Sequence, residues 1–519
     1  MADAMCSASE SPVNLVEMTL ERAQGALAGG TITAEALTRA YLERIDRLNP
    51  TYNAFIFINP NVIADARASD VRRRAGRASG PLDGIPVAVK DTMDMAGLPT
   101  TAGWSLLYKE KGGVNLMPAA DSPVVARLRA AGAVILGKTN VPILSHTGSH
   151  ANDSWAGPTY NAAGRGFVPG GSSAGTATAV AASMAILGLG EETGGSIQNP
   201  ASAQALVGIK PTFGLVPTTG VMPLSSLRDV VGPIARCVRD AALTLDVLAG
   251  YSAEDPKTAA GIGHKPKGGY ASKLDVDALR GKRIGSFGPG WHNQPLSAEA
   301  ASLYARSKAE MAAQGAVLVE DPFLDSGFAA LRRPTPPLPE YDGRGLESLP
   351  YDLQKYLEHL GPHASVRSFA EFAAATSKQD AFGPGGVLSF MPNVPHFNDS
   401  LANPLRPPDL SDFIALRETH LEIFNAVFER HRLDALVFPQ MREELPPLFG
   451  TTAIAATTVS EINIAGLPGI TVPAGYYASG APFCLIVVGP QWSEADLLSV
   501  AYAYECSTRH RRAPVFEET

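Results

Sequence analysis

Two short segments rich in glycine and serine are the part of this sequence best suited to chemistry. They are PGGSSAG (residues 169–175) and ETGGS (residues 192–196). Glycines let a substrate approach the backbone closely, and N–H groups left unpaired where a strand turns into a helix can stabilise an oxyanion. Ser196 is then a candidate nucleophile, although a plain glycine turn at a strand end has the same composition.

A nucleophilic serine needs a base, and no histidine or cysteine stands beside Ser196 in the sequence. Lys90 is a candidate because it ends the apolar segment IPVAVK (residues 85–90), where an ammonium would be poorly solvated. Burial favours the neutral form of lysine, and lowering its pKa from about 10.4 to about 7.5 costs roughly 4 kcal/mol. The simpler interpretation is a lysine that reaches solvent or pairs with Asp91.

The residues around these candidates predict alternating strands and helices. Residues 84–91 are typical of a buried strand, and residues 172–190 of a small-residue helix that runs into a strand. Between them, Ser122 and Pro123 predict the start of a helix that ends at Gly132. Such alternation indicates an α/β fold with a largely buried sheet.

Amphipathic patterns predict further helices along the chain. One covers residues 33–48, with Thr33 as its N-cap and Asn49-Pro50 as its stop. The others cover residues 236–249, 297–314 and 411–431.

The sequence changes character between about residues 326 and 410, where proline, glycine and aromatic residues gather. We expect an irregular excursion from the core there, forming a lid or a pocket wall, with a helix at residues 351–360. No segment demands a linker. Residues 31–519 are therefore expected to form one domain after an N-terminal segment of residues 1–30.

Aromatic residues hint at the substrate. Residues 387–397 (VLSFMPNVPHF), with Trp155, Tyr160 and Phe449, suggest an apolar or aryl group in the ligand. The alternative is that they only pack the excursion onto the core.

Composition argues against several classes of partner. The 519 residues carry a net charge of −8 with dispersed basic residues, which disfavours nucleic acid and anionic membranes. Four scattered cysteines show neither disulfide nor zinc spacing. The N-terminus lacks a signal peptide pattern and no apolar run is long enough to span a membrane, so we expect a cytoplasmic protein.

Four segments together resemble the amidase signature family of serine hydrolases, in consistent order from about residue 30 to about residue 505. These segments are PLDGIPVAVKDTMDMAGLPTTAGW, PGGSSAGTATAVAASMAILGLGEETGGSIQNPAS, GIKPTFGLVP and NIAGLPGITVPAG. The resemblance implies a single large α/β domain with a mixed, mostly buried central β-sheet covered by helices on both faces.

The resemblance also implies a Ser-cisSer-Lys triad. Ser196 would be the nucleophile, Ser172 the bridging serine after a cis Gly171–Ser172 peptide, and Lys90 the base. Ser173 would support the site by a hydrogen bond. The reaction would hydrolyse a small-molecule amide through an acyl-enzyme with water, and would use no cofactor and no metal.

The oxyanion of the tetrahedral intermediate would be bound by four consecutive backbone N–H groups. These belong to Thr193, Gly194, Gly195 and Ser196.

The sequence departs from the family pattern at three positions. Glu191-Glu192 stands where members usually carry Thr-Asp, and Gln198 where they usually carry Arg. One hypothesis is that Glu192 and Gln198 form a hydrogen-bonded pair in place of an Asp-Arg pair. The other is that Glu191 and Glu192 face solvent.

Other functions remain open at this point. GSSAG (residues 171–175) matches the G-x-S-x-G elbow of α/β-hydrolase esterases, with Ser173 as nucleophile and His420 or His431 as candidate base. A catalytic subunit of a glutamine-dependent amidotransferase, a fold kept only for binding, and a homodimer are further alternatives. Aryl amides, carbamates, esters and fatty amides all suit the same nucleophile.

Overall fold

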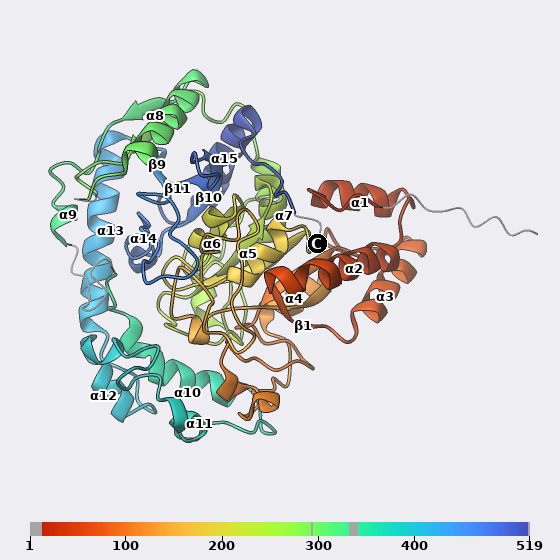
Figure 1. The fold of residues 1–519 in the computed structure, drawn as a ribbon. Helices are drawn as coiled ribbons and strands as arrows, with labels where there is room; N and C mark the ends of the chain where they lie inside the picture. Colours follow the sequence, from red (N-terminus) through yellow and green to blue (C-terminus); the bar gives the residue numbers. More distant parts are fainter. Residues whose placement is uncertain (1–12, 292–293, 332–340, 517–519) are drawn as a thin grey trace, which may run out of the picture.

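A mixed sheet of eleven strands runs through the residues that the computed structural model describes, which are 13–291, 294–331 and 341–516 (Figure 1). The order is β1-β3-β2-β4-β6-β5-β10-β11-β9-β7-β8. The strands are β1 Phe55–Ile58, β2 Pro86–Lys90, β3 Val134–Thr139, β4 Leu187–Glu192, β5 Val207–Lys210, β6 Val230–Ala235, β7 Arg283–Ser286, β8 Val317–Val319, β9 Ala435–Pro439, β10 Gly469–Tyr476 and β11 Pro482–Val488.

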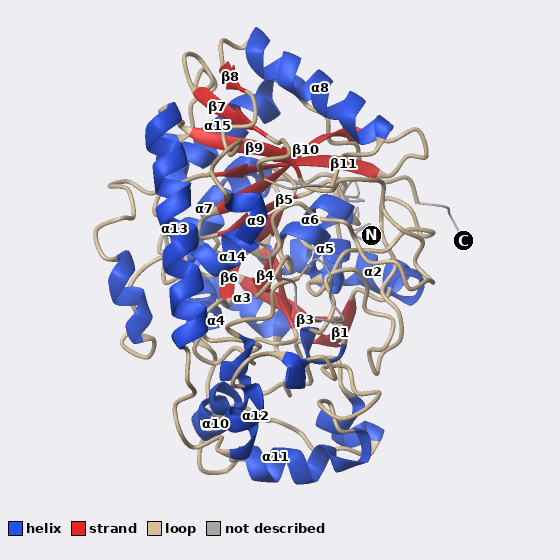
Figure 2. Cartoon of the chain, turned by 90° about the vertical axis from the view of Figure 1, so that its left-hand side faces the viewer, coloured by secondary structure: helices blue, strands red, loops and turns tan. Residues whose placement is uncertain are grey.

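Helices lie on both sides of this sheet, with α5 and α6 on one side and α7 and α15 on the other (Figure 2). The α-helices are α1 Leu20–Ala28, α2 Ala34–Tyr52, α3 Val62–Arg74, α4 Pro123–Ala130, α5 Ala174–Ala181, α6 Gln198–Ala203, α7 Val238–Leu248, α8 Ala298–Ala313, α9 Phe328–Leu331, α10 Leu349–His359, α11 Phe369–Thr376, α12 Phe397–Ala402, α13 Ser411–His431, α14 Glu461–Ala465 and α15 Glu494–Thr508. Every residue of β2, β3, β4 and β6 is buried, as strands covered on both faces must be. The predicted fold class is confirmed.

Strands β2 and β4 are parallel neighbours, and this pairing positions the candidate site. Val87 pairs with Leu187 and Val89 with Leu189, so both strands end at the same edge of the sheet. Lys90 therefore lies at the end of β2 beside the last residues of β4. The connection between the two strands includes α5, a helix of small residues that is buried along its whole length.

The predicted helix at residues 33–48 is longer than expected. Thr33 caps it as predicted, with its hydroxyl accepting from the N–H of Ala36 at 3.0 Å. The helix continues through Pro50 to Tyr52, however, so the predicted stop is wrong. The missing N–H of a proline falls in the last turn, and the side chain of Asn49 accepts the N–H groups that follow the helix.

The excursion forms α10, α11 and α12 at one end of the molecule, where they build a second hydrophobic cluster (Figure 2). The cluster joins residues such as Leu353 and Phe397 to Trp104 and Leu107, which come from the loops after β2. Residues 1–12 of the predicted N-terminal segment and 332–340 of the excursion lie outside the described residues. The division at residue 30 and the lid remain predictions.

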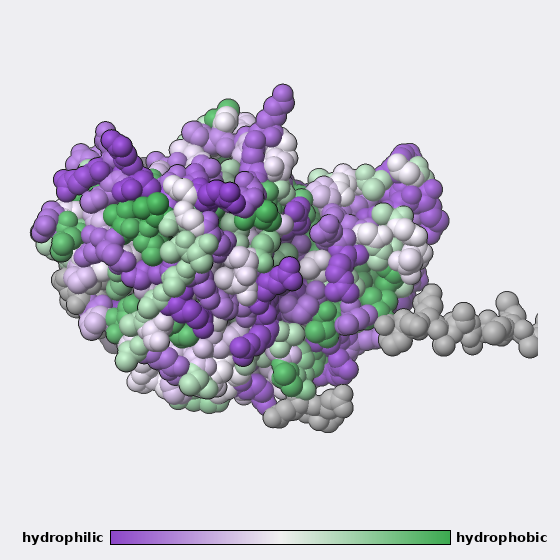
Figure 3. All heavy atoms as spheres, turned by 90° about the horizontal axis from the view of Figure 1, so that it is seen from above, coloured by the Kyte–Doolittle hydropathy of each residue, from purple (hydrophilic) through white to green (hydrophobic). Residues whose placement is uncertain are grey.

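The surface carries mixed polarity. On the face shown in Figure 3, hydrophobic residues occur in separate groups among hydrophilic ones. Within the described ranges, none of the helices combines the length and the apolar character needed to cross a membrane.

The packing of α5 generates a first prediction. A Cβ at Gly175 would lie 2.4 Å from the Ala54 carbonyl oxygen and 2.4 Å from the Asn140 nitrogen, so α5 would have to move. We expect Gly175→Ala to lower the free energy of unfolding by about 1–3 kcal/mol and to reduce turnover. Denaturant unfolding measures the first effect. Gly25→Ala is the control, because the helical Gly25 has open space around it and should gain about 0.5–1 kcal/mol.

Candidate active site

The amine of Lys90 is buried and in contact with three oxygen atoms. Its Nζ lies 2.6 Å from Ser172 Oγ, 2.7 Å from Glu191 Oε2 and 3.0 Å from the Glu191 backbone oxygen, and the side chain is 0 % exposed. Burial lowers the pKa of this amine, although the adjacent Glu191 carboxylate raises it, and the net shift is downward. The alternative pairing with Asp91 does not occur, because Asp91 pairs with Lys138 at 2.8 Å.

Ser172 and Ser173 lie where the chain enters α5. The peptide bond between Gly171 and Ser172 is cis, as predicted. The hydroxyl of Ser173 donates to the Glu191 backbone oxygen at 3.3 Å, and its N–H donates to the Ser196 carbonyl at 3.3 Å. Ser173 thus links the segment before α5 to the turn after β4.

Ser196 belongs to the turn between β4 and α6 and lines a cavity of about 550 Å³. Within the described residues, the backbone N–H groups of residues 193–196 donate to no protein group. By contrast, the next two N–H groups, of Ile197 and Gln198, are both bonded to Glu192. In the same part of the chain, no direct hydrogen bond joins the hydroxyls of Ser196 and Ser172, so the structure brings Lys90 to Ser172 but does not join Ser172 to Ser196.

The side chain of Glu192 is hydrogen-bonded to the chain just after the turn that carries Ser196. Its Oε2 accepts from the N–H of Ile197 at 2.7 Å and of Gln198 at 3.0 Å, and its Oε1 accepts from the side chains of Gln198 and Asn463. The oxygen of Gln198 is held in turn by the Thr458 hydroxyl at 2.7 Å. The predicted pair of Glu192 and Gln198 is confirmed, and the solvent-facing alternative is wrong, because Glu191 and Glu192 are both buried.

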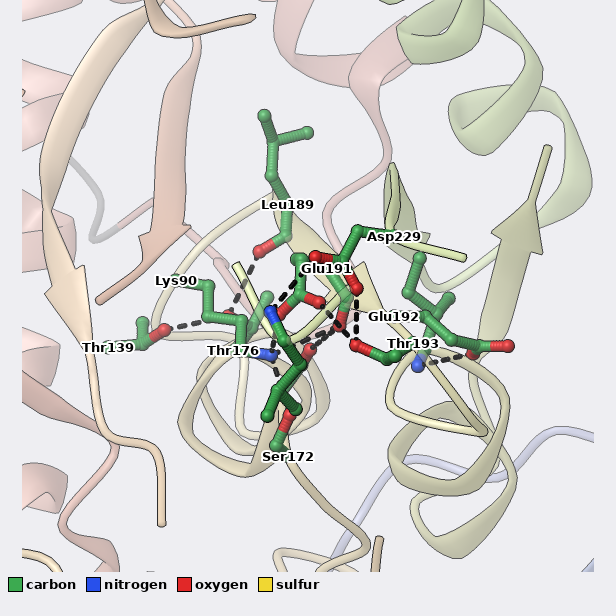
Figure 4. A network of polar contacts seen from close by, with 12 residues as sticks. Lys90, Thr139, Ser172, Thr176, Leu189, Glu191, Glu192, Thr193 and Asp229 are labelled. Carbon is green, nitrogen blue, oxygen red and sulfur yellow. Dashed lines mark hydrogen bonds and ion pairs between the residues drawn. The ribbon is translucent and has the colours of Figure 1, made fainter. Parts of the chain in front are cut away.

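The contacts of Glu191 are what the sequence interpretation missed, because this residue connects Lys90 to a second carboxyl group through Thr193 (Figure 4). The Thr193 hydroxyl lies 3.2 Å from Glu191 Oε1 and 2.6 Å from Asp229 Oδ1. Burial, and next the charge of Glu191, raise the pKa of Asp229 to about 8. Two adjacent acids at the end of an apolar strand were the available signal, because each must then have its own buried partner.

The cavity is lined by both polar and apolar residues. His146, Arg442 and Glu443 are among the polar ones, and the excursion contributes Leu346, Leu388, Phe390 and Met391 to the apolar ones. Residues 387–397 therefore do reach the cavity.

For the other aromatic candidates, the alternative of packing holds instead of pocket lining. Trp155 packs on Phe57 and Tyr108, and Tyr160 packs on Phe449, whose side chain is exposed. None of Trp155, Tyr160 and Phe449 lines the cavity.

The esterase alternative lacks its geometry. Ser173 is fully buried and does not line the cavity. The ring of His420 is hydrogen-bonded to the Leu416 carbonyl at 2.9 Å within α13, and His431 ends the same helix. No histidine among the described residues is hydrogen-bonded to Ser173.

The chain is similar to known proteins along most of its length. A family model described as Amidase matches residues 36–329. A glutamyl-tRNA(Gln) amidotransferase subunit from a Synechococcus strain is 33% identical over 501 residues, which cover 93% of this chain and 90% of that protein. A probable amidase of Arabidopsis thaliana is 30% identical, with 98% of this chain and 93% of that protein covered. The solved structure of native peptide amidase from Stenotrophomonas maltophilia matches with a TM-score of 0.78 and 34% identity, over 97% of this chain and 100% of that chain.

The support beneath the turn generates a second prediction. Glu192→Gln puts an amide N–H₂ where only acceptors fit, so we expect the free energy of unfolding to fall by about 2–4 kcal/mol. Denaturant unfolding followed by fluorescence measures this loss. Glu358→Gln is the matched control, because its pair with Lys355 is exposed and should change stability by less than about 0.5 kcal/mol. Equal losses in the two variants would contradict a special role for Glu192.

Proposed function

The chain belongs to the amidase (amidase signature) family and is an amide hydrolase, and from that premise we propose that it cleaves a small-molecule amide through an acyl-enzyme on Ser196. The observation that carries the proposal is the buried Lys90 amine, 2.6 Å from the Ser172 hydroxyl, beside a turn whose N–H groups are free to bind an oxyanion. Ser172 would relay the proton between Ser196 and Lys90.

Acylation would begin with attack of Ser196 Oγ on the amide carbonyl. As the new C–O bond forms, the Ser196 proton passes to Ser172, and the Ser172 proton passes to the lone pair of Lys90. The negative charge on the carbonyl oxygen is stabilised by the N–H groups of residues 193–196. When the C–N bond breaks, the proton returns through Ser172 to the leaving nitrogen, which departs as an amine.

Deacylation would use the same groups with water in place of the amine. Water attacks the acyl-enzyme, its proton passes through Ser172 to Lys90, and the Ser196 oxygen regains a proton as the acid departs. Ser196, Ser172 and Lys90 would then be back in their initial protonation states. The net reaction converts an amide and water into an acid and an amine.

The cavity supports a substrate with an apolar or aryl group. Its volume suits a small molecule, and Leu388, Phe390 and Met391 would contact the apolar part. The solved relative at 34% identity is a peptide amidase, so peptide amides join aryl amides, carbamates, esters and fatty amides as candidate substrates.

A second candidate function is that of a subunit in a glutamine-dependent amidotransferase. The relatives named as subunits of glutamyl-tRNA(Gln) amidotransferase, at 33% identity, are the observation that favours it. Such a protein would deliver ammonia to a partner, whereas the proposed amidase acts alone. The homodimer and the cytoplasmic location stay predictions.

A hydrolysis screen on the purified chain tests the proposal. We expect turnover of an aryl amide or a peptide amide without any partner or ammonia acceptor, and a fall of at least about 1000-fold in Ser196→Ala, because the acyl-enzyme cannot form. Amine release is the measurement, and mass spectrometry should detect the acyl group on Ser196.

Lys90→Met should abolish turnover to a similar extent. Full activity in that variant, or hydrolysis only of glutamine and only with a partner, would overturn the proposal. Circular dichroism of both variants controls for folding.

The pH dependence of turnover follows from the state of Lys90. Burial lowers the pKa of this amine below the usual range of lysine, and only the neutral amine can accept the proton. Thus kcat/KM should rise about tenfold per pH unit below that pKa, level off above it, and give an alkaline optimum. Rates measured at constant ionic strength test this, and a flat profile from about pH 5 to about pH 9 would contradict a lysine base.

A further inference from the structure

Two of the three oxygen neighbours of Lys90 Nζ belong to Glu191. They are Oε2 at 2.7 Å and the backbone oxygen at 3.0 Å, and the third neighbour is Ser172 Oγ at 2.6 Å. A carbonyl and an ionised carboxylate can only accept hydrogens, whereas a hydroxyl can also donate. A neutral amine has two hydrogens and one lone pair. Its hydrogens therefore go to Glu191, and the lone pair is left for the Ser172 hydroxyl.

We propose that Glu191 is a positioning residue for the base: it directs the lone pair of neutral Lys90 at Ser172 and stabilises the ammonium after proton transfer. This inference rests on the proposed function, in which Lys90 is the base. Through the cycle the Ser172 O–H bond breaks as the Lys90 N–H bond forms, and both changes reverse when the leaving group takes the proton. Glu191 stays ionised and takes no proton itself.

The hydrogen bonds of Thr193 indicate that Glu191 is the ionised carboxyl. The Thr193 hydroxyl has one hydrogen but contacts two carboxyl oxygens, of Glu191 at 3.2 Å and Asp229 at 2.6 Å. One of these contacts must be a donation from a carboxylic acid. Asp229 Oδ1 makes the shorter of the two contacts, and Oδ2 already accepts the N–H groups of Leu224 and Ser225, so Oδ1 is the Asp229 oxygen that can carry a proton toward Thr193.

Burial supports the same assignment. It raises the pKa of Asp229 to about 8, with the charge of Glu191 as the next cause. Asp229 is therefore protonated at neutral pH and donates to Thr193, and Thr193 donates to Glu191 (Figure 4). This arrangement fixes the carboxylate of Glu191 through Oε1, whereas Lys90 contacts Oε2.

The charged groups around this pair come from several segments of the chain. Glu191 and Glu192 of β4 and Asp229, just before β6, all act on Lys90. Lys138 of β3 faces Asp91 instead, and the charge of Lys257 acts on Asp229. Of these charged groups, only Glu191 is in contact with the amine, so replacing Glu191 should change the proton affinity of Lys90 more than replacing any of the others.

The decisive experiment is the pH profile of Glu191→Gln. The amide oxygen can still accept a hydrogen from Lys90, but the negative charge that favours the ammonium is lost. We expect the acid limb of kcat/KM to move to lower pH by about one to three units. The plateau of kcat should fall about 10- to 100-fold, because the ammonium formed during acylation loses its partner.

Asp91→Asn is the matched control. It breaks a second buried lysine–carboxylate pair, that of Asp91 with Lys138. Its effect therefore reports the loss of a buried ion pair that does not involve Lys90. We expect lower thermal stability and an acid limb that stays in place. An unmoved acid limb in Glu191→Gln, or an equal shift in Asp91→Asn, would overturn the inference.

A conservative variant covers the case in which Glu191→Gln fails to fold. Glu191→Asp keeps the charge but shortens the reach, so its acid limb should lie nearer to that of the unaltered protein while its plateau still falls. A shift as large as that expected for loss of the charge would count against Glu191. The rate at which a fluorophosphonate labels Ser196 provides the same profile without substrate.

The outcome for the unaltered protein separates the two proposals. A flat profile there removes Lys90 as the base, and the role of Glu191 falls with it. A clear acid limb that Glu191→Gln leaves unchanged removes only the role of Glu191.

Discussion

A lysine amine without access to water is the constraint on which the rest of this site depends. Lys90 is fully buried at the end of β2, where the charged form is disfavoured unless a carboxylate stands beside it. The parallel pairing of β2 with β4 places Glu191 at contact distance, and the entry to α5 places Ser172 there as well. Burial disfavours the ammonium at this position and the Glu191 carboxylate favours it, with a net lowering of the Lys90 pKa.

Three carboxyl groups share this region with one lysine, and each is stabilised differently. Glu192 accepts hydrogen bonds from four N–H donors on its two oxygens. Glu191 accepts from Lys90 and from Thr193, whereas burial raises the pKa of Asp229 to about 8. Because ionised carboxylates repel one another in a low dielectric, the raised pKa of Asp229 limits the negative charge in this buried region.

The sequence predicted what is encoded within short segments. The apolar run before Lys90, the glycine turn at residues 192–196 and the Thr33 cap are local patterns, and the structure has all three elements where they were expected. The contacts of Glu191 with Lys90 and of Thr193 with Asp229 join positions 101 and 36 residues apart, so no local pattern could reveal them.

Where the sequence interpretation of the aromatic residues differs from the structure, long-range contacts are again the reason. The side chains of Trp155 and Tyr160 are aromatic, and only the tertiary fold decides whether such rings line a cavity or pack against one another, as these do. The helix stop at Pro50 failed because Asn49 caps the end from inside the last turn. The excursion also contacts the turn after β4 directly: a Cβ at Gly194 would lie 2.6 Å from the Tyr341 ring, and the Tyr341 hydroxyl accepts from Arg228 at 3.1 Å. Glycine at position 194 is therefore needed for the packing of Tyr341, so the pocket lining and the turn that carries Ser196 cannot vary independently at this point.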